Sequence, residues 1–224
     1  YEDTFIENNV TAILGVGLFP GIGNAIAKHM SDSFNEIHDV TIERLGFVSN
    51  ASLSSIKKAR KDSPLGMRNT LITESRKKNA KAYSWFPPPY GLVETQAVAT
   101  GVKQLVKQFP NARNISVRYS EPKLPTFKER LRHLFLREQL TQKNACIKVQ
   151  MTGFVGEQVE GQVMSVKGDA LNIVCLTALE VITEFLTSKV KNSGIVLCSD
   201  YIEPKVLFTK LHDRKIKFYD FNRC

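Results

Sequence analysis

The sequence has few of the residues that small metal-bound or disulfide-bonded proteins depend on. Its 224 residues include four cysteines, at positions 146, 175, 198 and 224, with no CxxC pair and no histidine at zinc-ligand spacing. Zinc ribbons and disulfide scaffolds are therefore not expected, and reduced thiols in a cytoplasmic protein are predicted. A chain of this size can bury roughly 70% of the surface that its unfolded form exposes, so its core needs neither kind of cross-link.

The sequence also lacks an apolar run that is free of charge. The most apolar segment, residues 170–190, contains Asn172, Glu180 and Glu184, and a charge near the centre of a bilayer costs several kcal/mol. This segment is predicted to be a buried helix. No basic and then apolar leader precedes Tyr1, but the first residue is not Met, so we expect the natural chain to begin further upstream.

Acidic residues are fewer than basic ones. The 31 Lys and Arg and 22 Asp and Glu give a net charge of +9, which favours an anionic partner of some kind. Nine of the basic residues lie between residues 57 and 81, beside Asp62 and Glu74. This window has no groove-reading motif, so nucleic acid is disfavoured, whereas contact with an anionic membrane surface stays open.

The pattern of apolar residues predicts an α/β chain with an α+β tendency, in which helices flank a mixed sheet that contains antiparallel pairs. A hairpin at Gly156-Glu157 is predicted, and the three consecutive prolines in residues 83–91 predict a rigid aromatic loop. Strands are predicted over residues 10–14, 39–47, 114–119, 146–155, 158–166, 194–198 and 216–221, and helices over 21–30, 69–75, 93–109, 126–140, 170–190 and 204–214.

The sharpest motif is the glycine-rich stretch Gly15–Gly23, between a predicted strand and a predicted helix. Backbone N–H groups at the start of a helix can bind a phosphate or a carboxylate. As a dinucleotide fingerprint this stretch resembles the turn of short-chain dehydrogenases, but the chain has no Tyr-x-x-x-Lys pair and no acidic residue ending the next strand. A dinucleotide site, a structural turn and a loop at the substrate end all stay open.

A second resemblance spans nearly the whole chain. Residues Gly17–Ile22 resemble the Gly-Leu-x-Pro-Gly-Ile turn that opens the C-terminal part of saccharopine dehydrogenase-like oxidoreductases. Ser63–Gly66, Phe86–Leu92 and Ser193–Val196 are similar to later segments of that family, in the same order. The resemblance implies that residues 1–224 form a substrate-binding and dimerisation domain, the C-terminal half of a two-domain dehydrogenase. Its NAD(P)-binding Rossmann domain would lie upstream and is absent from this sequence.

The same resemblance implies that the turn faces the nicotinamide of NAD or NADP and the bound substrate. Cofactor contacts are then assigned to Gly17, Leu18, Pro20 and Gly21. Saccharopine dehydrogenases proper have an Asp in place of Phe19 and a His in place of Asn24. Phe19 and Asn24 are therefore predicted to contact a substrate other than saccharopine.

Three further residues are candidates for the substrate site. Arg68 and Arg76 would bind the carboxylate of an amino or carboxylic acid, because a guanidinium matches its geometry. Tyr90 would line the pocket. A solvated basic face, and a packing role for the aromatic residues, are the alternatives. No metal site is predicted, and structural roles are favoured for the four histidines, at positions 29, 38, 133 and 212.

Three functional hypotheses follow. The leading one is hydride transfer by an NAD(P)-dependent oxidoreductase, a homodimer of which this chain alone is inactive. The second is a non-enzymatic oligomerisation or membrane-associated module with a degenerate dehydrogenase fold, in which side chains such as Phe19 fill the site. The third is a self-sufficient enzyme that binds a dinucleotide directly at Gly15–Gly23.

Overall fold

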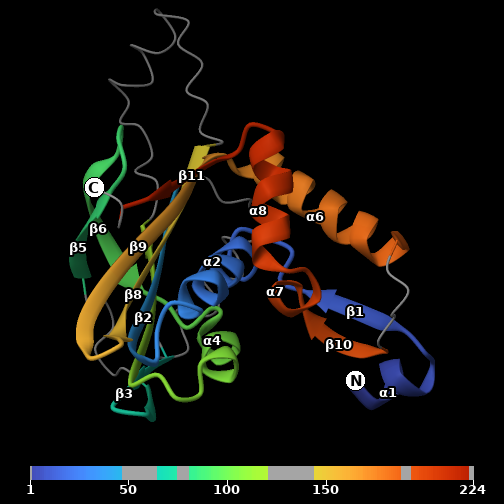
Figure 1. Cartoon of the computed structure of the whole chain (residues 1–224), viewed down its shortest axis with the longest axis horizontal. Coiled ribbons are helices and arrows are strands. Elements are labelled where there is room, and N and C mark those ends of the chain that lie inside the picture. Colours follow the sequence, from blue (N-terminus) through green and yellow to red (C-terminus); the bar gives the residue numbers. More distant parts are fainter. Residues whose placement is uncertain (1, 47–64, 75–80, 121–143, 188–192, 222–224) are drawn as a thin grey trace, which may run out of the picture.

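The computed structural model describes residues 2–46, 65–74, 81–120, 144–187 and 193–221 (Figure 1). Its helices and strands in chain order are α1 (Glu2–Glu7), β1 (Thr11–Leu14), α2 (Ile22–Ser31), β2 (Glu36–Gly46), β3 (Leu65–Arg68), β4 (Leu71–Glu74), β5 (Lys81–Phe86), β6 (Gly91–Ala97), α4 (Val102–Gln108), β7 (Asn114–Ser120), β8 (Asn144–Val155), β9 (Gln158–Asp169), α6 (Ala170–Thr187), β10 (Gly194–Leu197), α7 (Cys198–Tyr201), α8 (Pro204–Asp213) and β11 (Lys217–Asp220).

The main sheet is mixed, as predicted. Its nine strands follow the order β11-β9-β8-β2-β7-β3-β4, and the β5–β6 hairpin attaches to β7 through β6. β2 and β7 run parallel, while the other strand pairs of this sheet run antiparallel. The predicted hairpin between the two long strands is confirmed, with Gly156 at its turn in a left-handed conformation.

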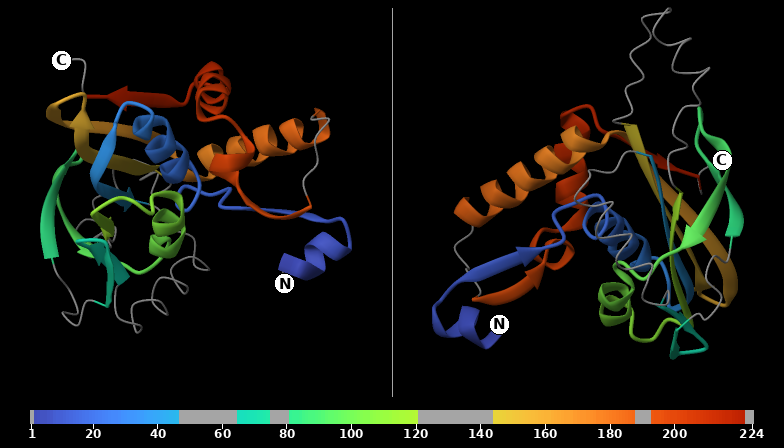
Figure 2. Two further views of the ribbon diagram at one scale, coloured as in Figure 1. Left: turned by 60° about the horizontal axis from the view of Figure 1, so that its bottom comes forward. Right: turned by 180° about the vertical axis from the view of Figure 1, so that it is seen from behind.

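Helices α2 and α4 cover one face of the main sheet (Figures 1 and 2). The apolar residues of α2 recur on one side of the helix, and Ile22 and Ile26 are fully buried there. They belong to the same core as Ile42 of β2 and as Ile147 and Met151 of β8. This core therefore lies between α2 and the centre of the main sheet.

The β5–β6 hairpin lies over the opposite face of the main sheet (Figure 2). Phe86 at the end of β5 is fully buried against Leu45 of β2 and Cys146 of β8. A second, smaller apolar cluster thus lies under the hairpin, and the central strands are packed on both faces at this end.

A separate two-stranded sheet projects from the side of the molecule that carries the helices (Figure 1). It consists of β1 and β10, which run parallel with Thr11 opposite Gly194 and Leu14 opposite Leu197. Both strands were predicted, but their pairing was not, because most of the chain lies between them. Helix α1 lies against β10, where Ile6 approaches Gly194.

Three predicted elements are wrong. The helix predicted at residues 69–75 is the β3–β4 hairpin, which turns at Asn69 and Thr70, both at positive φ. Residues 83–86 belong to strand β5, and the prolines form the hairpin turn that follows it. The helix predicted over 93–109 begins only at Val102, because the residues before it pair as β6. The helix predicted over 126–140 lies outside the described residues.

The segment of helix α6 was predicted to be a buried helix; it is a helix, but only one of its faces is buried. Ile173, Thr177 and Val181 are buried, whereas Leu179 and Ile182 on the other side are about half exposed. Glu180 is buried and accepts a hydrogen bond from Arg214 Nε at 2.9 Å. By length and composition this helix could cross a membrane, a test that core helices of soluble proteins also pass.

Candidate functional site

The glycine-rich turn links the projecting sheet to the main body of the molecule. β1 ends at Leu14, the chain turns, and α2 begins at Ile22, so the predicted strand, turn and helix are confirmed. Gly21 has φ 146°, and a Cβ built there would lie 2.6 Å from the carbonyl oxygen of Gly15 and 2.7 Å from the nitrogen of Gly17. The turn brings backbone against backbone here, and this is why glycine is required.

The amides at the start of α2 have partners within the turn itself. Gly21 N–H donates to Asn24 Oδ1 at 3.0 Å, Ile22 N–H to the Gly17 carbonyl at 3.0 Å, and Gly23 N–H to the Leu18 carbonyl at 3.0 Å. Leu18 is itself buried. These donors would have to exchange partners before they could bind an anion. The assignment of Gly17, Leu18, Pro20 and Gly21 to a cofactor stays a prediction.

Asn24 joins α2 to α4. Its Nδ2 donates to Gln108 Oε1 at 3.1 Å, and Gln108 Nε2 donates back to the Asn24 carbonyl at 3.1 Å. Because the side chain is 3% exposed and also accepts from Gly21, it holds the turn, α2 and α4 together. This packing role stands beside the predicted contact with substrate.

Phe19 lies between the two helices that border the turn. Its ring atom Cδ2 lies 3.0 Å from where a Cβ on Gly23 would be, and the ring overlaps the place of a Cβ on Gly101, which caps α4. The ring is partly buried against the main core. Two glycines therefore make room for one aromatic ring, and a side chain fills this space.

The structure does not bring the other predicted substrate residues to the turn. Arg68 is exposed on β3, and because its neighbour Met67 is buried in the core under the helices, Arg68 points to the other face of the sheet. Tyr90 packs with the cluster under the β5–β6 hairpin, also on the other face, and burial raises the pKa of its phenol. Arg76 lies outside the described residues.

Sequence reasoning missed a buried ionic cluster on the face opposite the helices. Lys148 of β8, Glu43 of β2 and Arg118 of β7 stand side by side in register across three adjacent strands. Lys148 Nζ lies 2.6 Å from Glu43 Oε2, with both side chains at most 3% exposed, and Arg118 Nε lies 3.9 Å from Glu43 Oε1. Burial lowers the pKa of the Arg118 guanidinium, and Glu43 partly opposes this shift.

The β5–β6 hairpin completes this cluster from above. Ser84 donates to Glu43 and accepts from Lys148, and Lys148 also donates to the Trp85 carbonyl at 2.7 Å. Arg118 donates to Thr95 Oγ1 of β6 at 2.8 Å. Each charged group thus contacts the hairpin directly or through a partner, and we interpret the cluster as a clamp that holds the hairpin on the sheet.

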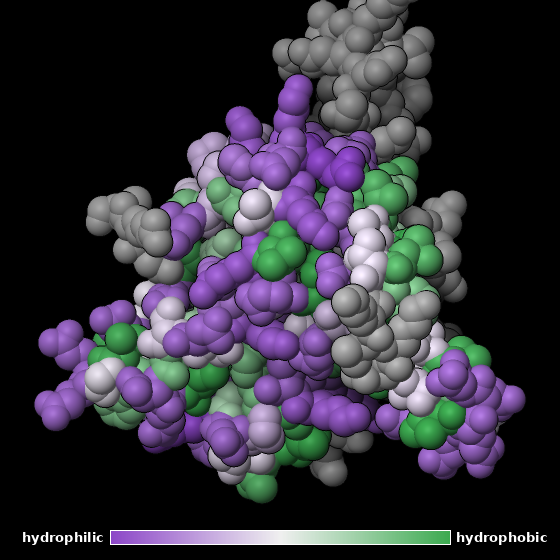
Figure 3. Space-filling view, turned by 45° about the vertical axis from the view of Figure 1, so that its right-hand side comes forward, coloured by the Kyte–Doolittle hydropathy of each residue, from purple (hydrophilic) through white to green (hydrophobic). Residues whose placement is uncertain are grey.

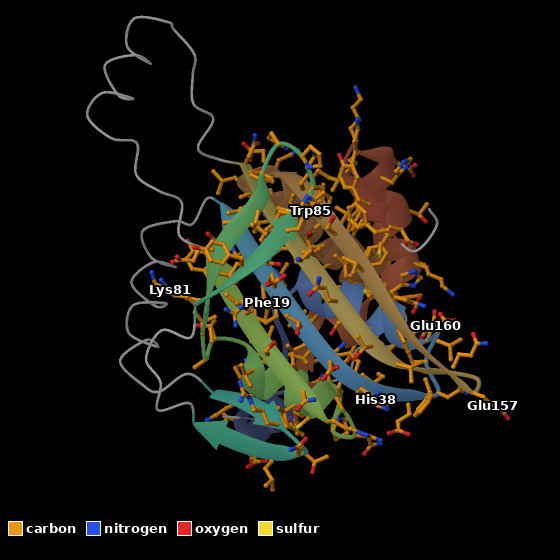
Figure 4. All side chains as sticks on the ribbon, turned by 90° about the vertical axis from the view of Figure 1, so that its left-hand side faces the viewer. Phe19, His38, Lys81, Trp85, Glu157 and Glu160 are labelled. Atoms are coloured by element: carbon orange, nitrogen blue, oxygen red, sulfur yellow. The ribbon has the colours of Figure 1, made fainter. Side chains whose placement is uncertain are left out.

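Beyond the hairpin, polar side chains continue along the same face of the sheet as the ionic cluster. Asp39 of β2 accepts from Asn114 Nδ2 and from Thr152 Oγ1, both at 2.6 Å, and Thr41 is hydrogen-bonded to Ser116 at 2.9 Å. Figure 4 looks onto this face, with Lys81 and Trp85 on the β5 strand and with His38 and Glu157 toward the opposite end. The alternation of polar and apolar residues along 39–47 indicates that the polar side chains share one face of the strand. Alternation alone does not show whether those side chains are buried and paired or exposed to solvent.

Other reactive groups are dispersed over the described ranges. Cys146 and Cys198 are buried, and burial raises their thiol pKa values to about 12 and about 11. His29 and His38 pack edge-on against Phe208 and Phe154. No group of three or more His, Cys, Asp or Glu side chains that could hold a metal ion occurs in the described part of the chain.

In comparisons with known proteins, no family model matches this chain, and no curated protein matches it either.

Proposed function

We propose that this chain is the substrate-side part of an NAD(P)-dependent oxidoreductase that resembles saccharopine dehydrogenase. One observation carries the proposal. β1 and β10 run parallel, and both end at the same edge, where β1 continues into the glycine-rich turn and β10 into α7. Open parallel sheets bind nucleotides and substrates outside the carboxyl ends of their strands, and the turn occupies that position.

The proposal gives the turn a limited role in holding the cofactor. The amides at the start of α2 are satisfied internally, so the phosphates of NAD or NADP would be held by another domain. Phe19, whose ring is partly buried, would present an apolar surface that excludes water from the reacting end. When bound, the nicotinamide supplies or accepts a hydride, and the substrate would be a small amino or carboxylic acid.

Nucleotide titration tests this proposal. The natural polypeptide, purified from its source, should quench or shift the fluorescence of NADH or NADPH, whereas residues 1–224 alone should not. Equal binding by both chains would favour the self-sufficient enzyme. Absence of binding by the natural polypeptide would contradict the proposal.

A second candidate function is a non-enzymatic interaction module in the cytoplasm. The position of Phe19 favours it, because the ring fills the space between Gly23 and Gly101 that a ligand would otherwise use. This candidate predicts a stable homodimer in sedimentation equilibrium together with no nucleotide binding by the natural polypeptide. A homodimer that binds nucleotide would instead agree with the oxidoreductase.

A further inference from the structure

We propose that the outer face of the β5–β6 hairpin and the adjoining end of the main sheet bind single-stranded nucleic acid. This inference goes beyond the oxidoreductase and does not depend on it, because the surface lies on the face of the main sheet opposite α2 and the glycine-rich turn. We call it the hairpin surface. It consists of Tyr83, Trp85, Leu92, Lys167, Lys217, Tyr219 and Phe221.

Two aromatic rings stand on the outer face of β5. Ser84 lies between them and points inward, where it contacts Glu43 and Lys148, so Tyr83 and Trp85 point away from the sheet. Tyr83 is 69% and Trp85 is 47% exposed, and within the described ranges no other aromatic side chain is as exposed. As alternate residues of a strand, the two are about 7 Å apart on one face. They form a platform of two adjacent rings.

The platform continues onto the edge of the main sheet. Phe221 follows β11, and its ring centroid lies 5.5 Å from that of Trp85, edge-on. Phe218 packs with α8 on the helix side, so Tyr219 faces the hairpin side. Leu92, directly opposite Trp85 in the hairpin, is 69% exposed. The exposed rings thus belong to a contiguous patch, and a contiguous apolar patch marks a binding surface.

Two lysines stand side by side at the end of this patch. Lys167 of β9 and Lys217 of β11 are directly opposite each other in register, and Lys167 Nζ lies 5.0 Å from the centre of the Tyr219 ring. Like charges in opposed positions repel, and no carboxylate of the described residues lies within ion-pair distance of either lysine. Lys81 at the start of β5 (Figure 4) is paired with Glu94 at 2.9 Å. The lysine pair is therefore the place for an anion.

Single-stranded nucleic acid matches the rings and the charge together. Its bases stack on aromatic side chains, while every nucleotide adds a phosphate. Phe221 and Lys217 are about 13 Å apart along the strand, which a few nucleotides can span. The absence of a groove-reading motif disfavours duplex recognition only, since stacking on exposed bases needs no groove. The net charge of +9 also favours a polyanion.

The apolar side chains exposed elsewhere are of a different kind. On the side of the molecule that carries α6, hydrophobic side chains occur among hydrophilic ones (Figure 3). Those of α6 that are most exposed, Ile182 and Leu186, are aliphatic and offer no flat ring to a base. They provide a matched control for the hairpin surface.

The fluorescence of Trp85 tests the proposal, because it is the only tryptophan among the 224 residues. At 50 mM NaCl, a labelled 12-nucleotide oligo-dT or oligo-U should quench this fluorescence and gain anisotropy, and binding should weaken at 200 mM NaCl. The tighter of the two strands identifies DNA or RNA as the source. An abasic strand and a duplex of the same length should bind at least fivefold more weakly. Equal binding of the abasic strand, or no binding of either single strand, would overturn the proposal.

Variants separate stacking from charge. Tyr83→Ala and Trp85→Ala should each weaken oligonucleotide binding at least fivefold, whereas Leu186→Ala on α6 should leave it unchanged. Lys217→Gln should reduce the slope of log affinity against log salt by about 0.7, the value for one phosphate contact. Lys205→Gln, at an exposed site on α8, should leave the slope unchanged. Circular dichroism checks that the variants fold. Unchanged affinity in both aromatic variants would overturn the proposal.

Two other occupants would give different results. Flotation of the chain with phosphatidylcholine–phosphatidylserine vesicles that is abolished by Trp85→Ala, without binding of either oligonucleotide, would overturn the proposal in favour of a membrane. A blue shift of Trp85 emission that grows with protein concentration, in the absence of nucleic acid, would overturn it in favour of a second copy.

Discussion

Gly21 is the residue at which the glycine-rich turn tolerates least change. Its φ of 146° is unfavourable for any side chain, and the backbone of Gly15 and Gly17 occupies the space that a Cβ would need. Gly156 offers a matched control, because it too has a positive φ but has nothing within 4 Å of its Cβ position.

We expect Gly21→Ala to lower the free energy of unfolding by about 3 kcal/mol or more, since backbone strain and steric overlap add together. Gly156→Ala should cost about 1–2 kcal/mol, from the strain alone. Urea denaturation of both variants measures the difference. Equal losses would mean that the turn can open around a side chain, and the close approach described above would be wrong.

The cysteines differ in environment, which predicts their reactivity. Cys175 is exposed on α6, whereas the raised thiol pKa values of Cys146 and Cys198 keep these groups protonated at neutral pH. Because the thiolate is the nucleophile, a Cys224→Ser chain should react with one equivalent of a thiol reagent at pH 8 while it is folded. The additional Cys175→Ser change should abolish this fast reaction. Fast reaction of a second thiol would show that a buried site opens readily.

At the scale of elements, the ionic cluster decides whether the β5–β6 hairpin stays on the sheet. Lys148→Met leaves Glu43 buried beside Arg118 at 3.9 Å, without its closest charged partner. We expect a loss of about 3–5 kcal/mol, since removing one member of a buried pair leaves an uncompensated charge. The double change Lys148→Met with Glu43→Gln should recover part of this loss, as a double-mutant cycle by urea denaturation would measure.

The exposed pair on the same hairpin is the control for that experiment. Lys81 and Glu94 lie 2.9 Å apart but are well exposed to solvent, so Lys81→Met should leave stability nearly unchanged. If Lys148→Met lowered the free energy of unfolding as little as Lys81→Met, the cluster would not hold the hairpin.

Elements with strong local signals could be predicted from the sequence, and those that depend on distant partners could not. β8 and β9 alternate regularly and meet at Gly156, so their hairpin was predictable. The β3–β4 hairpin was not, because it turns at Asn69 and Thr70, and Thr is an unusual residue at positive φ. β5 was not predicted, because the three consecutive prolines led residues 83–91 to be interpreted as a loop. The prolines lie in the turn after β5 and not in the strand.

The ionic cluster was beyond sequence reasoning for a different reason. Glu43, Ser84, Arg118 and Lys148 come from four strands. The parallel pairing of β2 with β7, the antiparallel pairing of β2 with β8 and the folding of the hairpin together bring them into contact. The glycine-rich turn was predictable because its strand, turn and helix are contiguous. The position of Phe19 against Gly101 was not, since it depends on how α4 packs.

At the scale of the whole molecule, the two buried thiols make stability depend on pH in the alkaline range. The pKa values of Cys146 and Cys198 rise from the ordinary thiol value of 9.0 to about 12 and about 11 in the fold. Above pH 9 the unfolded chain therefore binds fewer protons than the folded one, so stability decreases as pH rises. We expect the thermal midpoint to fall between pH 9 and pH 11, and to fall less in a Cys146→Ala, Cys198→Ala double variant than in the parent chain. If the thermal midpoint fell equally steeply with pH in the parent chain and in the double variant, other groups would control the alkaline loss of stability.

The placement of Phe19 also constrains how this protein can change through evolution. Its ring occupies the place of a Cβ on residue 101 and lies 3.0 Å from the place of a Cβ on residue 23, so the side chain at residue 19 limits what residues 23 and 101 can be. A lineage that places a side chain at residue 101 must first shorten residue 19. The acquisition or loss of a ligand at this turn would then follow a fixed order of substitutions, which an ancestral reconstruction would reveal as a change at residue 19 that always precedes one at residue 101.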